Sequence, residues 1–311
     1  MTDGYRALRE TNGQIDLESR GRIRVTGDDR ARLLHAMTTN QIKDLVPGSG
    51  CYAFFLNAQG RVLADGNILC FDDHLLLDVE PESRAFLMEH LDKYVIADDV
   101  TLEDVTQSTF AVGIEGPGAE AALRNAGLPA PQAPLTHEAA GPLIVIRASS
   151  TGAPGFRVMG PSGIRGDSRV PAFPQSSPAD AKTIRLEHFF PRYGDDITMA
   201  NLPQETAIED ALNFNKGCYL GQEIVERVRS RGHVNRILTG LIIKGDQPLE
   251  RGAKISFEAS EVGEISSSAY SPALSATVAM GYIRMHAAKP GTQVSVDGRP
   301  AHCAAIKSSR T

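Results

Sequence analysis

The spacing of apolar residues along the first 160 positions predicts short strands that alternate with short helices. Ile23 and Val25 alternate with charged residues, which predicts a strand over 21–26. A helix is predicted after Pro81, because apolar residues recur there at helical spacing and Pro is favoured at a helix start. Further strands are predicted at 51–56, 61–70, 75–79, 109–115, 143–147 and 155–159, and further helices after Gly27 and Gly118. A strand–helix–strand grouping therefore occurs twice.

The hydrophobic pattern changes near Asn235. Beyond it, six short β-type segments are separated by Gly, Pro or Asp, and their even spacing predicts a small antiparallel barrel or sandwich of about 75 residues. The stretch 161–181 is rich in Pro, Ser and Gly, which predicts a loop. We therefore expect an α+β core over 1–235 and a β-domain over 236–311.

Composition narrows the class of protein. The chain has 311 residues, 41% of them hydrophobic, which is enough to form buried hydrophobic cores. Its net charge of −6 argues against a surface that binds nucleic acid over its whole extent. No apolar run reaches the length of a membrane span, and the first 16 residues lack the apolar segment of a signal peptide. The four cysteines (Cys51, Cys70, Cys218 and Cys303) are widely scattered, so we expect neither disulfides nor a metal site, and a cytoplasmic location.

The densest chemistry lies in Lys216-Gly217-Cys218-Tyr219-Leu220-Gly221-Gln222-Glu223. A thiol between two glycines suggests tight backbone turns beside something bound. If a helix begins near Tyr219, its N-terminus and Lys216 would both stabilise a Cys218 thiolate, which makes Cys218 a candidate reactive group. The alternative is that Cys218 is a small buried apolar residue.

This segment resembles the K-G-C-[FY]-x-G-Q-E signature of the YgfZ-type folate-binding proteins, which are relatives of the glycine cleavage T-protein, an aminomethyltransferase. Other segments resemble the same family in the same order, and together they span about residues 20–245. They are 25–29, 38–40, 60–65, 151–156, 185–187 and 193–197. The resemblance implies a pseudo-symmetric α+β ring of two related subdomains with a C-terminal β-barrel.

The resemblance also implies tetrahydrofolate, or a one-carbon derivative of it, as the cofactor. Glu187 stands where the family has the glutamate that contacts the pterin, and a carboxylate matches a planar N–H/NH₂ pair. The alternative is a solvated or ion-paired glutamate beside Arg185. Asp65, Tyr52 and Asn57 lie on a central predicted hairpin and are candidates to line the same cavity. For Tyr52, a place in the apolar core is an equal alternative. Four residues of the Cys motif and the segment after it are further candidate cofactor-binding residues: Lys216, Gly217, Gln222 and Arg227.

One departure from the family pattern concerns two adjacent aspartates of the aminomethyltransferases. This chain has Ala64 at the first position and Asp65 at the second, so a carboxylate that would orient a folate nitrogen is expected to be missing. That difference favours a YgfZ-type function over glycine cleavage.

A basic run follows the Cys motif and consists of Arg227, Arg229, Arg231, His233 and Arg236. Such a run is usually a solvated face of the protein. If it has a function, it could bind the polyglutamate tail of folate or a negatively charged partner protein. Aromatic residues are not interleaved with it, so RNA binding is the weakest alternative.

The sequence therefore predicts a tetrahydrofolate-binding protein that supports the assembly or repair of Fe–S clusters, with Fe–S client or assembly proteins as partners and no membrane. A folate-dependent aminomethyltransferase or other one-carbon transferase is the first alternative. A folate-independent adaptor protein is the second.

Overall fold

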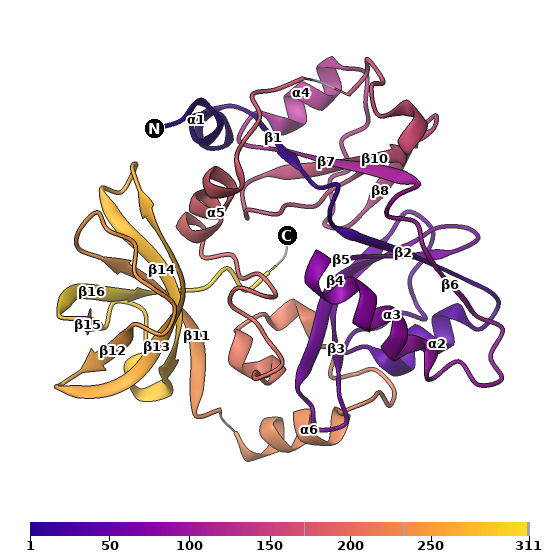
Figure 1. The fold of residues 1–311 in the computed structure, drawn as a ribbon. Coiled ribbons are helices and arrows are strands. Elements are labelled where there is room, and N and C mark those ends of the chain that lie inside the picture. The colour runs from indigo at the N-terminus through magenta and orange to yellow at the C-terminus, as the bar shows by residue number, and fades with distance from the viewer. Residues whose placement is uncertain (171, 233, 310–311) are drawn as a thin grey trace.

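The computed structural model describes residues 1–170, 172–232 and 234–309 of the chain. Two subdomains, each built on a five-stranded sheet, and a C-terminal barrel stand around a common centre (Figure 1). The predicted pseudo-symmetric α+β fold with a β-barrel is confirmed. Within the described residues, no helix is long and apolar enough to span a bilayer.

The first subdomain contains the sheet β3-β4-β5-β2-β6. Its strands are β2 (Gly21–Thr26), β3 (Gly50–Leu56), β4 (Val62–Cys70), β5 (Leu75–Val79) and β6 (Thr101–Asp104), and its helices are α2 (Arg30–Met37) and α3 (Arg84–Asp92). A 3-10 turn, η1 (Pro81–Ser83), precedes α3, so the α-helix predicted to open at Pro81 begins three residues later. Ile23 and Val25 are fully buried under α2 and α3, as their alternation predicts.

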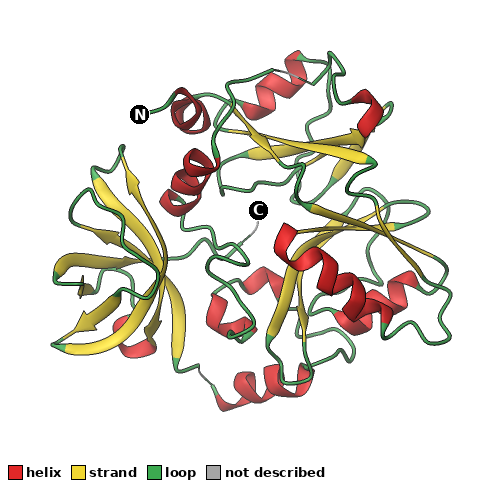
Figure 2. Ribbon diagram, viewed as in Figure 1, coloured by secondary structure: helices red, strands yellow, loops and turns green. Residues whose placement is uncertain are grey.

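The second subdomain contains the sheet β1-β7-β10-β9-β8. Its strands are β1 (Gly13–Asp16), β7 (Thr109–Glu115), β8 (His137–Ala140), β9 (Leu143–Ile146) and β10 (Gly155–Pro161). The helices of this half are α1 (Asp3–Glu10), α4 (Ala119–Asn125) and α5 (Pro178–Glu187), with η2 (Ser162–Ile164) after β10. The segment 161–181 therefore ends in the first turn of α5. Apolar side chains fill the space between the sheet and α4, and helices lie on the outer sides of both sheets (Figure 2).

The N-terminal strand of the chain belongs to the second sheet, not to the first. The N-terminal strand β1 pairs with β7 of the second sheet, whereas β6 pairs with β2 of the first sheet. The chain thus crosses between the sheets at 17–20 and again at 105–108. Arg22, 1% exposed, donates to carbonyl oxygens of Leu17 and Thr106, one in each crossing, and so ties the crossings together.

The C-terminal strands close into a barrel of order β11-β14-β13-β12-β15-β16, which decides between the predicted barrel and sandwich. They are β11 (Arg236–Ile243), β12 (Lys254–Phe257), β13 (Ser260–Ser271), β14 (Ala276–Arg284), β15 (Gln293–Val296) and β16 (Arg299–Ala304). A cluster of apolar side chains fills the barrel interior. The helix α6 (Gln222–Arg231) precedes the barrel, and the remaining 3-10 turns are η3 (Pro203–Thr206), η4 (Glu209–Ala211) and η5 (Met285–Ala287).

Candidate functional site

Three adjoining cavities are linked by shared lining residues. The Asp65 cavity, about 30 Å³, is lined by Tyr52, Asp65 and Asn67 of the first sheet and by Ser149, Arg157 and Phe190 from the other half. The Lys307 cavity, about 300 Å³, shares Ala148, Ser149 and Phe190 with it. The Lys182 cavity, about 400 Å³, shares Arg20, Glu80, Ser150 and Arg192 with it.

Asp65 and Tyr52 form the polar centre of the Asp65 cavity. The Tyr52 hydroxyl donates to Asp65 Oδ2 at 2.5 Å, and both residues are at most 5% exposed. They come together because β3 and β4 pair with Phe54 opposite Asp65, so that Tyr52 and Asp65 project from the same face of the sheet. The structure thus brings together two of the predicted site residues.

The departure at Ala64 leaves the carboxylate of Asp65 in this cavity. Neighbouring residues on a strand point to opposite faces of the sheet. Ala64, opposite Phe55, is fully buried in the apolar cluster beneath α2 and α3, whereas Asp65 lines the cavity. An aspartate at position 64 would enter the apolar core, so the cavity carboxylate is the one that the chain has.

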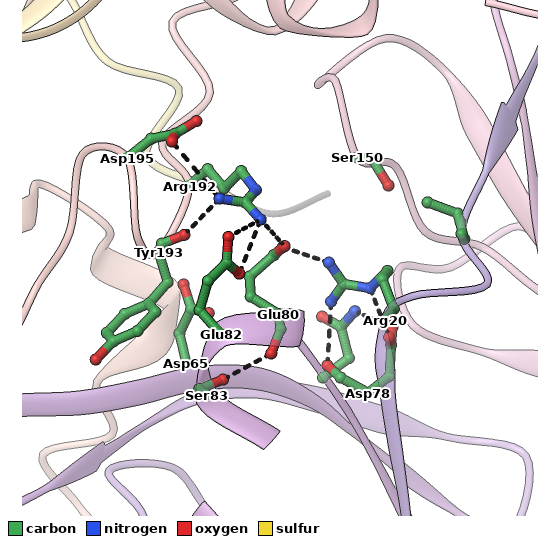
Figure 3. A network of polar contacts seen from close by, with 12 residues as sticks. Arg20, Asp65, Asp78, Glu80, Glu82, Ser83, Ser150, Arg192, Tyr193 and Asp195 are labelled. Carbon is green, nitrogen blue, oxygen red and sulfur yellow. Dashed lines mark hydrogen bonds and ion pairs between the residues drawn. The ribbon is translucent and has the colours of Figure 1, made fainter. Parts of the chain in front are cut away.

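A chain of ion pairs separates the Asp65 cavity from the Lys182 cavity (Figure 3). Arg192 contacts Glu80 at 3.0 Å and Glu82 at 2.8 Å. Arg20 pairs with the same Glu80 and donates to Asp78 Oδ1 at 2.7 Å. Since Arg20, Glu80 and Arg192 line both cavities, these pairs form the partition between them.

Tyr193 follows Arg192 in the chain and contacts strand β4 of the first sheet. Its hydroxyl donates to the Leu63 carbonyl oxygen, next to the Ala64–Asp65 step of β4. Burial, together with the negative charges of Asp65 and Glu82, raises the pKa of Tyr193 to about 12. Tyr193 therefore stays neutral at physiological pH and acts as a hydrogen-bond donor.

The Lys307 cavity combines apolar walls with two cations. Phe190, Pro134 and Pro154 supply apolar surface, and Arg147 and Lys307 supply positive charge. Lys307 follows the barrel, and its ammonium donates to the Gly152 carbonyl oxygen at 2.8 Å. Burial lowers the pKa of Lys307, although the nearby Glu115 opposes that shift.

Glu187 lies at a different place from Asp65. Its carboxylate, with the side chain 3% exposed, accepts from Tyr5 Oη at 2.6 Å and Ser271 Oγ at 2.5 Å, and it pairs with Arg9. Burial and this bond to Glu187 raise the pKa of Tyr5 to about 12. Glu187 is the last residue of α5, and there it joins α1, α5 and β13. The structure does not bring it to the Tyr52–Asp65 pair.

Asn57 also lies away from that pair, at the tip of the β3–β4 hairpin. Its Oδ1 accepts from the backbone N–H groups of Gln59 and Arg61, so the side chain shapes the turn. A Cβ on Gly221 would lie 2.5 Å from the Asn57 carbonyl oxygen, so the tip packs closely against the start of α6.

Lys216 closes the C-terminal end of α2. Its Nζ donates to the carbonyl oxygens of His35, at 2.5 Å, and of Thr38, and it lies 4.7 Å from the centre of the Tyr219 ring. Such carbonyls have no partner inside the helix, so Lys216 is a helix cap. Burial lowers the pKa of Lys216 to about 8. The structure places this predicted folate-binding residue in a structural contact.

Cys218 is exposed, in a loop that ends before α6. The expected helix start near Tyr219 was wrong: α6 begins at Gln222, after Gly221 in the left-handed conformation. The Lys216 ammonium is directed at α2 carbonyls. Among the four cysteines, Cys218 is distinguished by its exposure.

The other candidates of the Cys motif lie around α6. Gln222 Oε1 accepts from the Tyr219 N–H at 3.1 Å, whereas Gly217 and Arg227 are exposed. In the basic run, Arg229 lies over the Phe214 ring and Arg236 contacts Glu205 at 3.2 Å. His233 and the side chain of Arg231 lie outside the described residues. None of the described residues of this group is among those that line the three central cavities.

Sequence reasoning missed Asn67, which lines the Asp65 cavity, and Asp78, which lies behind the lining and holds Asn67 in place. Asn67 stands two positions after Asp65 on β4 and so shares its face, and its amide donates to Asp78 Oδ2 at 3.0 Å. Two polar residues with this spacing in an otherwise apolar strand were the signal that could have identified this wall.

Comparison with known proteins agrees with this architecture. The structure of glycine cleavage system aminomethyltransferase T from Bartonella henselae superposes with a TM-score of 0.86, at 23% identity, over 98% of this chain and 88% of that one. At that identity the likeness defines the fold: an aminomethyltransferase-like ring with a barrel.

The chain belongs to the glycine cleavage T-protein family. Residues 1–163 match the GCVT N-terminal domain, and residues 236–310 match the glycine cleavage T-protein C-terminal barrel domain. It is 29% identical over 294 residues to a putative chloroplastic transferase of Arabidopsis thaliana, covering 91% of this chain and 67% of that protein. It is 27% identical over 317 residues to an aminomethyltransferase of Streptomyces coelicolor, covering 95% and 85%. Aminomethyltransferases of this family use tetrahydrofolate.

Proposed function

We propose that this protein binds tetrahydrofolate at the centre of the ring and takes part in one-carbon transfer, as an aminomethyltransferase or a close relative. The observation that carries the proposal is the buried Asp65 carboxylate, held by Tyr52 in the Asp65 cavity. The family match and the relatives named as transferases support the reaction class.

The residues around the cavities fit the chemistry of a folate. A pterin edge carries adjacent N–H and NH₂ donors, which a carboxylate such as Asp65 accepts. Phe190 lines both the Asp65 and Lys307 cavities and offers an aromatic wall at their junction. Arg147 and Lys307 offer positive charge to the carboxylates of the glutamate tail. Since the Asp65 cavity is small, only an edge of the pterin would reach Asp65, and most of the ligand would occupy the larger Lys307 cavity.

Bound tetrahydrofolate supplies the nitrogen atoms that carry a one-carbon unit. The part of the protein is to orient that ligand and exclude water. A carboxylate within reach of a folate N–H is also suited to accept its proton. Tyr193, which stays neutral, donates to the backbone beside Asp65 and keeps that strand in place.

Support for Fe–S cluster assembly or repair is a second candidate function. It is favoured by the K-G-C-Y-L-G-Q-E segment, which resembles YgfZ-type proteins, and by the exposure of Cys218 outside the central cavities. In this candidate function, Fe–S client or assembly proteins contact the loop that carries Cys218. All four cysteines are free thiols, which suits a reducing compartment such as the cytoplasm.

Two assays on the intact protein separate these functions. Calorimetric titration with tetrahydrofolate tests binding, and release of ammonia from an aminomethylated lipoyl carrier protein tests transfer. Binding with turnover supports the transferase. Binding without turnover, together with loss of Fe–S enzyme activity in cells that lack the protein, supports the second function. Absence of binding would leave the folate-independent adaptor.

A further inference from the structure

One short loop contributes to all three central cavities. Ser149 lines the Asp65 and Lys307 cavities, Ser150 lines the Asp65 and Lys182 cavities, and Gly152 lines the Lys307 cavity. The position of loop 149–152 therefore sets the wall that faces Asp65 across the smallest cavity.

Glu115, the last residue of β7, holds this loop from within the protein. It is 0% exposed, and its carboxylate accepts from Ser149 Oγ at 2.8 Å and from the backbone N–H groups of Ser150, at 2.6 Å, and Thr151, at 3.1 Å. The Thr151 hydroxyl is a fourth donor. A buried carboxylate requires such donors, and four of them fix the loop backbone as well as its side chains.

The surroundings leave Glu115 little freedom. A Cβ at Gly155, on the paired strand β10, would lie 2.7 Å from Glu115 Cγ, so only glycine leaves room for the side chain. Burial raises the pKa of Glu115, although the four donors oppose that shift. The end of the loop has a second contact, because the Lys307 ammonium donates to the Gly152 carbonyl oxygen.

Loop 149–152 places the Ser150 hydroxyl, a possible donor, in the same cavity as the Asp65 carboxylate, an acceptor. Ser150 Oγ accepts from Arg157 Nη2 at 3.3 Å, which leaves the Ser150 hydrogen to be donated to a ligand. A pterin edge carries a carbonyl acceptor beside its N–H donors. Asp65 and Ser150 thus offer complementary groups to the two kinds of atom on that edge.

We propose that Glu115 is a positioning residue for tetrahydrofolate, and that it fixes loop 149–152 so that Ser150 donates to the pterin carbonyl while Asp65 accepts from the pterin N–H groups. This inference rests on the proposed function, because it names the second wall of the same site. The Ser150 hydroxyl would then favour ligands whose ring carries a carbonyl acceptor beside the N–H groups.

Three variants of the full chain test the proposal by calorimetry with tetrahydrofolate. Glu115→Gln keeps the shape of the side chain but turns an N–H₂ group toward the donors of loop 149–152. The dissociation constant for tetrahydrofolate is expected to rise at least about tenfold, as for loss of a charge-assisted hydrogen bond. Thr151→Val removes one donor at constant shape and is expected to raise the dissociation constant severalfold. Thr151→Ser keeps the hydroxyl and is expected to bind as the natural protein does.

Hydrogen exchange supplies a readout that a general loss of stability would not give. In Glu115→Gln, the amides of Ser150 and Thr151 are expected to exchange faster, while the amides of barrel strands β13 and β14 keep their natural rates. Uniformly faster exchange in both regions would mean that Glu115 only stabilises the fold, and the positioning role would be wrong.

The outcomes separate this inference from the function on which it rests. If the natural protein does not bind tetrahydrofolate, the proposed function fails. If the natural protein binds and Asp65→Asn does not, but Glu115→Gln and Thr151→Val bind normally, only the role of Glu115 is overturned. Should Glu115→Gln fail to fold, the comparison of Thr151→Val with Thr151→Ser decides, and equal affinities would contradict the proposal.

Discussion

Asp78 on β5 and Arg157 on β10 form a buried ion pair that joins the two subdomains, with both side chains 4% exposed. Asp78 also accepts from Arg20 and Asn67, so it is surrounded by donors from both halves of the ring. Breaking a buried pair leaves a desolvated charge, which is costly.

The first prediction follows from this pair. Arg157→Met is expected to lower the free energy of unfolding by about 3 kcal/mol, because Asp78 loses its partner in the second subdomain. Urea denaturation of Arg157→Met, Asp78→Asn and the double variant forms a double-mutant cycle. A coupling energy near zero would show that the two side chains do not depend on each other.

The second prediction concerns the contact between the β3–β4 hairpin and α6. Gly221 has φ +81° and its Cβ would lie 2.5 Å from the Asn57 carbonyl oxygen. Gly232 has φ +94°, but a Cβ there would meet no described atom within 4 Å. Gly232→Ala is therefore expected to cost about 1–2 kcal/mol from conformation alone. Gly221→Ala is expected to cost clearly more, because it adds the clash.

Thermal denaturation of the two glycine variants makes the comparison. The difference between them isolates the close approach of the hairpin from the backbone preference that they share. Equal losses of stability would mean that the hairpin tip moves aside at little cost and that its packing on α6 is loose.

The third prediction is a pH dependence at Lys216. Burial lowers its pKa in the folded protein to about 8, below the ordinary value of 10.5. Between these values the unfolded chain binds more protons than the folded one, so the stability contributed by Lys216 rises as pH increases from about 8 to 10.5. A neutral amine still has two N–H groups for the carbonyls of His35 and Thr38.

The comparison for Lys216 is with Lys216→Met. The natural protein is expected to gain about 1 kcal/mol relative to Lys216→Met over that window, once solvent screening is allowed for. Urea denaturation at several pH values measures the difference. Parallel stability curves for the two proteins would show that Lys216 keeps an ordinary pKa in the folded state.

The fourth prediction concerns the thiols. Cys218 is exposed, whereas burial raises the pKa of Cys51 to about 12 and that of Cys303 to about 11. The thiolate is the reactive form, so Cys218 is expected to alkylate first with iodoacetamide at pH 7. Because Cys218 does not line the central cavities, tetrahydrofolate is expected to leave its rate unchanged. Peptide mapping after timed alkylation measures both, and faster labelling of Cys51 would contradict the described burial.

Features that depend on local pattern could be read from the sequence. The alternation of Ile23 and Val25 identified a strand and its buried face, and the change of pattern near Asn235 preceded the barrel. Tyr52 and Asp65 could be placed on one hairpin from the sequence, because a short turn joins the two strands, which are five residues apart in the structure. The same alternation, applied to Ala64, would have placed that residue in the core and Asp65 in the cavity.

Features that depend on distant contacts could not be read. Glu187 meets Tyr5, 182 positions away, and Ser271, 84 positions away, and these partners decide where its carboxylate lies. Lys216 caps a helix that lies far earlier in the chain. The wall opposite Asp65 comes from the second subdomain, and a local pattern does not show which residues face each other across the ring.

The central claim is that Asp65 binds the pterin of tetrahydrofolate. Calorimetric titration of the natural protein, Asp65→Asn and the exposed control Asp72→Asn tests it most directly. Loss of a charge-assisted bond costs about 1.5–3 kcal/mol, so Asp65→Asn is expected to bind roughly tenfold to a hundredfold more weakly, and Asp72→Asn is expected to bind normally. An unchanged dissociation constant in a folded Asp65→Asn protein would contradict the claim.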